Sequence, residues 1–564
     1  MDSDDQKPAD QRPAPDTDVA VETAMEPGPE GDAESGRLGR STAFFSIATG
    51  FSRVAGLIRE IVAASYFGVT GPMSAFTIAF QLPNLVRMLF ADAALQAAFV
   101  PVFTEQLEAG KRPSAFRLAS TLIFLVTVVL GFITAAFILL APVLVLLVAP
   151  GFDSATEDLA ISLSQLLFPI LVMLGISGVV VGVLNSYNRF GVFAIAPLFW
   201  NIAIIAVLVG LAPAFPEGDE IYAYAIGVIV GTALQLAMVA WDLRNTPFRL
   251  QRVFDWRSPL VKRVLILMLP VTISLGLINF NLSINSLFGT LVEGTIVAPD
   301  GTLQPLGSYA PAAIDKAFRI YMLPQGMFSV AVATVIFPTL SRFAARREYD
   351  NLRATMANGM RMIILVLMPA AAAILVLSDP MTQLVYQRGE FDAAQTELVS
   401  TALFWFAFSL PFNGLFLLMT RTFFSLQRPW IPAVIAALNL LLTALGSLAL
   451  YEPFGISGIV AATAIATSVS VFAQGVILRR ELNGLEIGSL IDGAIRIAIG
   501  SLVLAGVTYA VWSGLDSALG EGTLGQIAAV GGGLVAGGLS YLGVILALRV
   551  PEARQIINVV RPSG

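Results

Sequence analysis

The chain has 564 residues, of which 56% are hydrophobic and only 13% are charged, whereas ordinary soluble domains carry about 25% charged residues. Its mean hydropathy of +0.79 and its sequence pI of about 5.0 exclude a soluble enzyme, a disordered protein and a nucleic-acid-binding protein as the main interpretation. Cysteine and histidine are absent, which excludes disulfides, thiolate nucleophiles, imidazole acid–base chemistry and the commonest metal ligand. We therefore expect a polytopic membrane protein, not an enzyme, with no cofactor and no nucleic-acid partner.

The first 40 residues differ in composition from the rest of the chain. They hold eleven Asp or Glu, four Lys or Arg and five Pro, with no aromatic residue. This composition cannot form a hydrophobic core, and the segment has no apolar stretch typical of a signal peptide. We predict a disordered, acidic cytoplasmic tail over residues 1–41.

Fourteen apolar segments follow the tail, each with the roughly 20 residues that a helix needs to cross the hydrocarbon core. The predicted spans are residues 42–67, 71–106, 115–149, 158–187, 190–212, 220–242, 264–291, 308–341, 354–378, 396–424, 431–450, 455–478, 490–513 and 526–549. The second and eighth are too long for one straight helix, and we expect their Leu-Pro pairs at Pro83 and Pro324 to kink them. The fold class is therefore an all-α membrane protein with about 14 transmembrane helices.

Lysine and arginine concentrate in one set of loops. The loops after even-numbered spans carry almost all of them, for example Arg112, Arg252 and Arg346, whereas the loops after odd-numbered spans carry only Arg388. Positively charged loops stay on the cytoplasmic side of a membrane. Both termini are therefore predicted to be cytoplasmic.

Several landmarks recur at a nearly constant offset, which indicates an internal repeat; chance similarity between apolar helices is the alternative. The offsets are 241 for Pro83 and Pro324, 239 for Asp153 and Asp392, 239 for Arg189 and Arg428, and 238 for Asn201 and Asn439. An offset that contains six spans predicts two six-helix lobes, related by a pseudo-twofold axis along the membrane normal, with a central cavity between them. The predicted domains are an N-terminal lobe at 42–245, a C-terminal lobe at 246–480, and helices 13 and 14 with a cytoplasmic C-terminus at 481–564.

A small set of charged residues lies inside the predicted spans: Arg53, Arg59, Glu60, Arg87, Asp315, Lys316 and Arg319. An arginine at the bilayer centre costs about 2.5–3.5 kcal/mol even on a lenient scale, so these side chains are expected to face a water-filled cavity or a ligand. Structural ion pairs, such as Asp315 with Arg319 one helical turn away, are the alternative. Because cations outnumber nearby carboxylates and guanidinium groups bind phosphate oxygens bidentately, the set predicts a site for a phosphate or pyrophosphate headgroup.

Three stretches of the chain carry a resemblance to a known family. They are FSRVAGLIRE at 51–60, FQLPNLVRMLFADAALQAAFVPVF at 80–103 and RIYMLPQGMFSVAVATVIFPTLSR at 319–342. In this order they resemble the lipid II flippase family (MurJ/MviN) of the MOP exporter superfamily. The resemblance implies two six-helix lobes plus two added helices. It also implies transport of the undecaprenyl-pyrophosphate-linked peptidoglycan precursor, lipid II, from the inner to the outer leaflet of the bacterial cytoplasmic membrane.

The resemblance also implies roles for individual residues. The cavity arginines of the family correspond to Arg53, Arg59, Arg87 and Arg319, its LPN asparagine to Asn84, and an acidic position to Glu60. Relatives often carry an acid where this chain has Ser74, Phe318 and Met322. Glu60 and Asp315 are expected to replace those acids as partners of the arginines, and Lys316 completes the predicted substrate site.

We expect transport by alternating access, driven by the membrane potential or an ion gradient, with lipid II, membrane lipids and cell-wall synthesis proteins as partners. Relatives are thought to bind sodium in the C-terminal lobe. The seventh, eleventh and twelfth predicted spans offer only neutral oxygens, such as those of Asn285, Asn439, Thr443 and Thr463, so no tight Na⁺ site is predicted. The alternatives are an exporter of another polyprenyl-linked glycan or of drugs, and a non-transporting scaffold of cell-wall synthesis recruited through the acidic tail.

Overall fold

The computed structural model describes residue 48 and residues 50–90, 93–187, 189, 191–298, 301–485, 487–520 and 522–552. Helices make up most of these residues, and the strands found there form one short antiparallel hairpin. The predicted class, an all-α membrane protein, is therefore confirmed. The predicted acidic tail at residues 1–41 lies outside the described residues.

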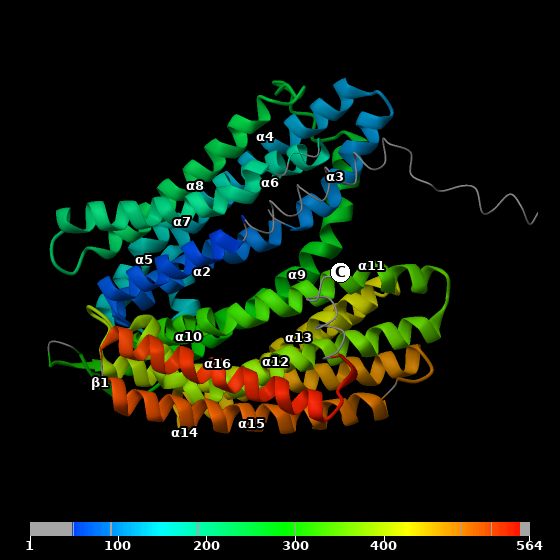
Figure 1. Cartoon of the computed structure of the whole chain (residues 1–564). Helices are drawn as coiled ribbons and strands as arrows, with labels where there is room; N and C mark the ends of the chain where they lie inside the picture. Colours follow the sequence, from blue (N-terminus) through cyan, green and yellow to red (C-terminus); the bar gives the residue numbers. More distant parts are fainter. Residues whose placement is uncertain are drawn as a thin grey trace, which may run out of the picture.

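The first half of the chain forms a bundle of long helices, which lies at the top of Figure 1. Its members are a helix at residues 50–67, α2 (Gly71–Phe90), α3 (Ala93–Glu108), α4 (Arg112–Val148), α5 (Ser154–Leu167), α6 (Ile170–Ser186), α7 (Gly191–Leu211) with a 3₁₀ turn η1 (Ala212–Ala214), and α8 (Ile221–Leu243). We call these elements the first bundle.

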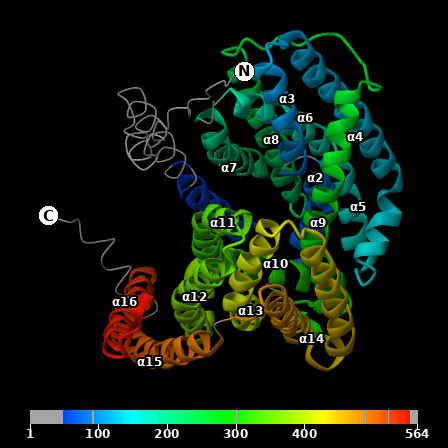
Figure 2. The same cartoon turned by 90° about the vertical axis from the view of Figure 1, so that its right-hand side faces the viewer.

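The second half forms another bundle below the first in Figure 1. Its members are α9 (Pro259–Thr290), the hairpin β1 (Thr295–Val297) and β2 (Leu303–Pro305), η2 (Leu306–Ser308), α10 (Ala310–Pro324), η3 (Gln325–Ser329), α11 (Val330–Ala345), α12 (Tyr349–Tyr386), α13 (Ala393–Ser425) and α14 (Trp430–Glu481). We call these elements the second bundle. Two further helices, α15 (Ile487–Leu519) and α16 (Thr523–Ala547), pack on α12 at its periphery (Figure 2).

The number of membrane-spanning helices is consistent with fourteen. Within the described residues, ten helices or helix pairs are long and apolar enough to span a membrane. One of them, Trp430–Glu481, is broken at Gly455, whose φ of 54° and ψ of −133° interrupt the helix, so it holds two spans. The helix at residues 50–67, the α2–α3 pair and α9 are not among the ten and supply the remaining three.

Proline marks an irregular point in the predicted eighth span. The α-helix α10 ends at Pro324, and the chain continues through the π-helical turn Gln325–Ser329 into α11. Proline removes a backbone donor and disturbs the preceding turn of the helix. The Leu-Pro pair is therefore followed by an irregular turn, and the kink expected there stays a prediction. Pro83 lies inside α2.

Equivalent N-caps support the predicted repeat. The Asp153 side chain caps α5 by accepting the Thr156 N–H at 3.1 Å, and the Asp392 side chain caps α13 by accepting the Gln395 N–H at 2.8 Å. Such caps satisfy backbone donors that the first turn of a helix leaves free. The two capping residues, Asp153 and Asp392, are 239 positions apart, and so are the two donors, Thr156 and Gln395.

Equivalent ion pairs occur at the opposite end of the bundles. Arg189 pairs with Asp242 at 2.6 Å in the first bundle, and Arg428 pairs with Glu481 at 3.7 Å in the second. Arg189 lies in the loop before α7 and Asp242 near the end of α8, whereas Arg428 lies in the loop before α14 and Glu481 at the end of α14. The offset is again 239 at both positions, so the two bundles share local contacts as well as landmarks in the sequence.

The two bundles lie close together at the end that carries β1 and further apart at the end that carries the arginine-rich loops (Figure 1). The helix α9 connects them, because its first turns pack on the first bundle. Val261 and Val264 join the buried cluster of Phe99 and Phe103. The domain boundaries at 245 and 480 stay predictions, since a helix shared between the bundles has no sharp boundary.

Candidate substrate-binding cavity

A cavity of about 480 Å³ lies between the two bundles. Side chains of the helix at residues 50–67, α2, α6, α7, α8 and α10 line it. The lining residues are Arg59, Glu60, Met73, Phe76, Thr77, Phe80, Gln81, Asn84, Ile170, Leu174, Pro197, Trp200, Tyr224, Val228, Thr232, Gln235, Asp315, Phe318, Arg319 and Met322. We call it the inter-bundle cavity. Because both bundles supply its wall, a movement of one bundle against the other changes its shape.

Five charged residues form one network at this cavity, with four of them in its wall and Lys316 buried behind it. We call this network the Glu60 cluster. The Glu60 carboxylate accepts a hydrogen bond from Lys316 Nζ at 2.7 Å, pairs with Arg59 and lies 3.8 Å from Arg319 Nε. Arg319 also forms the expected one-turn pair with Asp315, at 3.1 and 3.3 Å. Glu60 belongs to the first bundle and its Lys316 and Arg319 partners to the second, so the cluster joins the bundles.

The Glu60 cluster carries a net positive charge. Among the described residues it holds three cations and two carboxylates. The Arg319 side chain is 36% exposed, whereas those of Arg59 and Asp315 are 11% exposed and that of Lys316 is fully buried. The cation that a ligand reaches most easily is therefore Arg319, and Lys316 lies beneath Glu60 rather than in the cavity wall.

Aromatic rings hold the cations in place. The Arg59 guanidinium lies over the Trp200 ring at 4.8 Å, and the Trp200 indole N–H donates to Thr232 at 3.1 Å. Lys316 Nζ lies 5.7 Å from the centre of the Tyr386 ring. Such cation–π contacts orient a cation and compensate part of its lost hydration. No sequence motif singles out Trp200 or Tyr386, because their partners come from distant helices.

Two of the predicted site residues stand apart from this cavity wall. Lys316 is buried behind it. Arg53 lies at another position of the first helix, where its guanidinium donates to the Gly326 carbonyl of η3 at 3.3 Å. The side chain of Arg87 is outside the described residues. The structure brings the other five together in the cavity wall: Arg59, Glu60, Asn84, Asp315 and Arg319.

The positions where relatives often carry acids have other contacts here. The Ser74 hydroxyl accepts the Ala312 N–H at 3.2 Å, which links α2 to the first turn of α10. The Phe318 ring packs on the rings of Tyr321 and Phe406, with 5.6 Å between centroids in both pairs. These contacts leave Glu60 and Asp315 as the carboxylates that pair with Arg59 and Arg319 in this structure.

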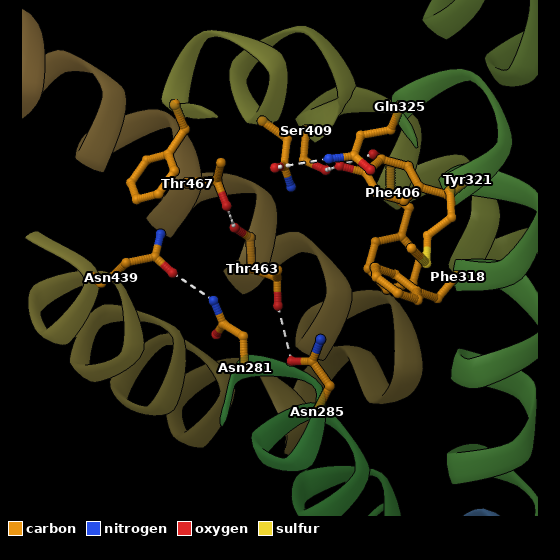
Figure 3. A pocket seen from close by; sticks show the side chains of 14 residues that line it. Asn281, Asn285, Phe318, Tyr321, Gln325, Phe406, Ser409, Asn439, Thr463 and Thr467 are labelled. Atoms are coloured by element: carbon orange, nitrogen blue, oxygen red, sulfur yellow. Dashed lines mark hydrogen bonds between the residues drawn. The ribbon is translucent and has the colours of Figure 1, made fainter. Parts of the chain in front are cut away.

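A second, smaller cavity of about 250 Å³ lies inside the second bundle (Figure 3). It shares Phe318 and Met322 with the inter-bundle cavity. None of its described lining residues is charged, and carboxamides supply most of its polar groups: Asn281, Asn285, Gln325, Asn413 and Asn439. We call it the amide cavity.

Two of the carboxamide oxygens of the amide cavity have donors, whereas Asn281 Oδ1 is buried without a hydrogen-bond partner in the part of the chain that the structure describes. Asn281 Nδ2 donates to Asn439 Oδ1 at 2.5 Å, and the Thr463 hydroxyl donates to Asn285 Oδ1 at 2.9 Å (Figure 3). The search of the described residues finds no cluster of three or more acidic side chains that would hold a metal ion. A dehydrated cation normally needs a carboxylate among its ligands, so the residues present fit a resident Na⁺ poorly.

The fold matches solved structures of membrane transporters. Residues covering 92% of the chain superpose on 99% of "Lipid II flippase MurJ, inward closed conformation", with a TM-score of 0.74 and 22% identity. A multidrug resistance MATE family transporter of the MOP superfamily, in an inward-facing conformation, matches 77% of the chain and 94% of its own length, with a TM-score of 0.62 and 14% identity. The protein therefore has the MOP exporter fold.

The family follows from the sequence comparisons. The family model described as "Lipid II flippase MurJ" matches residues 63–527. A probable lipid II flippase MurJ of Rhizobium meliloti is 34% identical over 424 residues, which cover 74% of this chain and 76% of the relative. The lipid II flippase MurJ of Burkholderia cenocepacia is 29% identical over 414 residues, or 72% of this chain and 77% of the relative. The chain belongs to the lipid II flippase MurJ family, as its sequence motifs predict.

Proposed function

We propose that this protein flips lipid II from the inner to the outer leaflet of the bacterial cytoplasmic membrane. The observation that carries the proposal is the net positive charge of the Glu60 cluster in a cavity between two bundles. A cationic cavity favours an anionic headgroup and disfavours a cationic drug. The names of the relatives, lipid II flippases, support the same substrate.

Arg319 and Arg59 are the residues that we expect to bind the pyrophosphate. Two of the five donors of the Arg319 guanidinium bind Asp315, which leaves others for a bidentate contact with phosphate oxygens. Arg59 is oriented by the Trp200 ring. Lys316 acts as a positioning residue, because it holds the Glu60 carboxylate against both arginines from below.

We propose that the bundles rock against each other in alternating access, with the arginine-rich end in the cytoplasm. The end that carries β1 is then the outer end. Single cysteines in this cysteine-free chain test the orientation. An impermeant thiol reagent should label Ser154→Cys in intact cells and Ser114→Cys only after lysis, and the opposite result would reverse the assignment.

The test of the proposed function is complementation of a bacterium depleted of its lipid II flippase, with lipid II accessibility measured at the outer surface. We expect the wild-type protein to restore accessibility, and Arg59→Ala and Arg319→Ala to lose it while they insert at normal levels. The matched control is Arg257→Ala, because Arg257 stacks on Trp256 outside both cavities. Normal function of both cavity variants would contradict the pyrophosphate site.

Two further experiments separate the remaining alternatives. A pyrophosphate site does not by itself distinguish the attached saccharide, so purified protein is compared on lipid II and on another polyprenyl-pyrophosphate-linked glycan. Flipping of the second lipid alone would assign the protein to that glycan. Deletion of residues 2–40 tests the scaffold alternative: a transporter should retain most of its activity, whereas a scaffold recruited through the acidic tail should lose it.

A further inference from the structure

The backbone of the first bundle touches the end of a helix from the second bundle at Gly151. This residue lies in the loop between α4 and α5, and its N–H donates to the Thr290 hydroxyl at 3.3 Å. A Cβ atom at position 151 would lie 1.9 Å from the Thr290 carbonyl oxygen. Thr290 is the last residue of α9. The contact therefore leaves no room for any side chain at position 151.

The second bundle makes the equivalent contact with the first. Gly389 lies in the loop between α12 and α13, and a Cβ atom there would lie 2.2 Å from the Ser65 carbonyl oxygen. The next residue, Glu390, donates its N–H to the same oxygen at 3.1 Å. Ser65 lies near the end of the helix at residues 50–67. Gly151 and Gly389 are 238 positions apart, so the repeat makes this contact reciprocal.

A hydrogen bond between the bundles lies beside each glycine. Asp153 of the first bundle lies two residues after Gly151, and its Oδ1 accepts a hydrogen bond from the Ser308 hydroxyl of the second bundle at 2.6 Å. The Val69 N–H of the first bundle donates to Gln395 Oε1 of the second at 2.6 Å. Both contacts lie at the end that carries β1. The bundles are therefore joined there by two matched sets of polar contacts.

Contacts of this kind suit an interface that opens and closes. Carbonyls at the end of a helix lack partners within the helix and accept hydrogen bonds from water just as readily. Separation of the bundles would therefore expose backbone groups that water can satisfy, together with apolar side chains, since one buried cluster includes Phe67 and Phe152 of the first bundle and Tyr386 of the second. The close approach requires glycine for steric reasons at Gly151, where no positive φ is present; Gly389 has a φ of 61° in addition.

We propose that Gly151 and Gly389 form a reciprocal gate that holds the outer end closed, and that both contacts separate whenever the inter-bundle cavity opens outward. The inference rests on the alternating access of the proposed function, but not on the identity of the lipid. It assigns to the two glycines the role of positioning residues for the closed state. A methyl group at either position would favour the state in which the bundles are apart.

Gly151→Ala tests the gate with a cysteine at Thr77, a residue that lines the inter-bundle cavity. The added methyl group overpacks the contact in the closed state, and a tenfold shift toward the open state corresponds to about 1.4 kcal/mol. We therefore expect an impermeant thiol reagent, added from outside, to label Thr77→Cys about tenfold faster in the Gly151→Ala background. An unchanged rate of labelling would overturn the proposal.

Gly458→Ala is the matched control. A Cβ atom at Gly458 would lie 2.0 Å from the Leu450 carbonyl oxygen, which is an equally close contact with a backbone oxygen. Both residues belong to the second bundle, so the clash does not press the bundles apart. We expect labelling of Thr77→Cys to stay at the reference rate in this background, and an equal acceleration would attribute the effect to general destabilisation.

A cross-link gives a second test that does not depend on the folding of the alanine variant. The pair Asp153→Cys and Ser308→Cys is joined across the bundles by a short, reducible thiol cross-linker, and flipping of a fluorescent polyprenyl-pyrophosphate lipid is measured in proteoliposomes. We expect flipping to fall to background and to return on reduction. The control pair, Asp153→Cys and Thr156→Cys, lies within the first bundle and should keep its activity.

The outcomes separate the gate from the proposed function. Unchanged flipping by the cross-linked pair would show that the outer end need not open there, and would refute the gate while the transporter stands. Absence of flipping by the wild-type protein would refute the proposed function, whereas the labelling of Thr77→Cys would still report whether Gly151 holds the outer end closed.

Discussion

The two cavities share a wall of Phe318 and Met322 but differ in chemistry. The charged cluster at the inter-bundle cavity includes ion pairs that cross from one bundle to the other, such as that of Lys316 with Glu60 at 2.7 Å. The amide cavity is neutral, and its hydrogen bonds join helices of one bundle, as Asn281 does with Asn439 at 2.5 Å. Charge is therefore placed where the bundles meet, and neutral amides where helices stay packed together.

This difference indicates how each cavity responds to movement. A charged contact between bundles must be broken or replaced when they separate, and an anionic ligand is the natural replacement partner for the arginines. A neutral amide network inside one bundle keeps its hydrogen bonds while the bundle moves as a unit. The predictions below test this contrast from the largest expected effect to the smallest.

The largest expected effect is the loss of Glu60. Its removal in Glu60→Gln leaves the fully buried Lys316 ammonium without a carboxylate, and breaking a buried ion pair typically costs about 3–5 kcal/mol. We expect the free energy of unfolding in detergent to fall by that amount. The double variant Glu60→Gln with Lys316→Met should recover most of the loss, because no unpaired charge remains.

The control for this prediction is Glu105→Gln. Glu105 pairs with Arg263 at 2.9 Å, but both side chains are more than half exposed, so we expect a change below about 1 kcal/mol. Equal destabilisation by Glu60→Gln and by the double variant would contradict the buried pair as the source of the effect.

The second prediction concerns the geometry of Arg319. Arg319→Lys keeps the charge but loses the planar fork that binds carboxylate and phosphate oxygens bidentately. We expect its flipping rate to fall about tenfold, since charge-assisted hydrogen bonds contribute roughly 1.5–3 kcal/mol, whereas Arg319→Ala falls to background. Arg257→Lys is the control. Wild-type rates for Arg319→Lys would indicate that charge alone is used.

The third prediction contrasts the cavities as sites of energy coupling. The lining of the amide cavity offers neutral oxygens, of which those of Asn439 and Asn285 already have donors, whereas moving one charge through 100 mV contributes about 2.3 kcal/mol. We expect flipping in proteoliposomes to change several-fold with the membrane potential and to ignore a Na⁺ gradient at zero potential. Transport that follows Na⁺ instead, and that is lost in Asn285→Ala, would make the amide cavity the coupling site.

The smallest expected effect is a pH dependence at the outer end. Burial by itself would raise the pKa of Asp153, but the hydrogen bonds from Ser308 and Thr156 outweigh it and hold this pKa below its ordinary value. The contact with Ser308 is therefore fully present above the ordinary value of about 3.9 and is lost as pH falls through the lowered pKa.

The measurement for Asp153 is the rate of Thr77→Cys labelling in proteoliposomes. Relative to the reaction of a free thiol at the same pH, we expect this rate to rise about twofold as pH falls below the ordinary pKa of an aspartate, because a partly exposed interaction contributes only a few tenths of a kcal/mol. Asp153→Asn should remove this dependence. A pH profile that is the same with Asp153→Asn would locate the titrating group elsewhere.

The sequence predicts the helices and the repeat well because hydrophobic length and loop charge are local properties. Asp153 and Asp392 show this: their constant offset indicates a repeat, and both residues cap a helix at equivalent points of the two bundles. The one-turn pair of Asp315 and Arg319 is predictable for the same reason, since helical spacing alone brings the two side chains together.

The sequence predicts the composition of the binding cavity less well. Charge inside a predicted span singles out Arg59, Glu60, Lys316 and Arg319, but not which of them a ligand reaches. The tertiary structure covers Lys316 completely and leaves Arg319 partly exposed. It also brings Trp200 against Arg59. These differences depend on neighbours from other helices, and no local pattern encodes them.

The sequence by itself determined that the chain crosses a membrane many times, repeats itself once and carries charges that need partners, because these follow from residue types and spacing along one helix. Only the tertiary structure decided that the bundles meet through Gly151 on Thr290 and Gly389 on Ser65. A glycine in a loop has many uses. At each of these two positions, a backbone oxygen from the other half of the chain leaves no room for a side chain. The packing of the two bundles brings that oxygen into place.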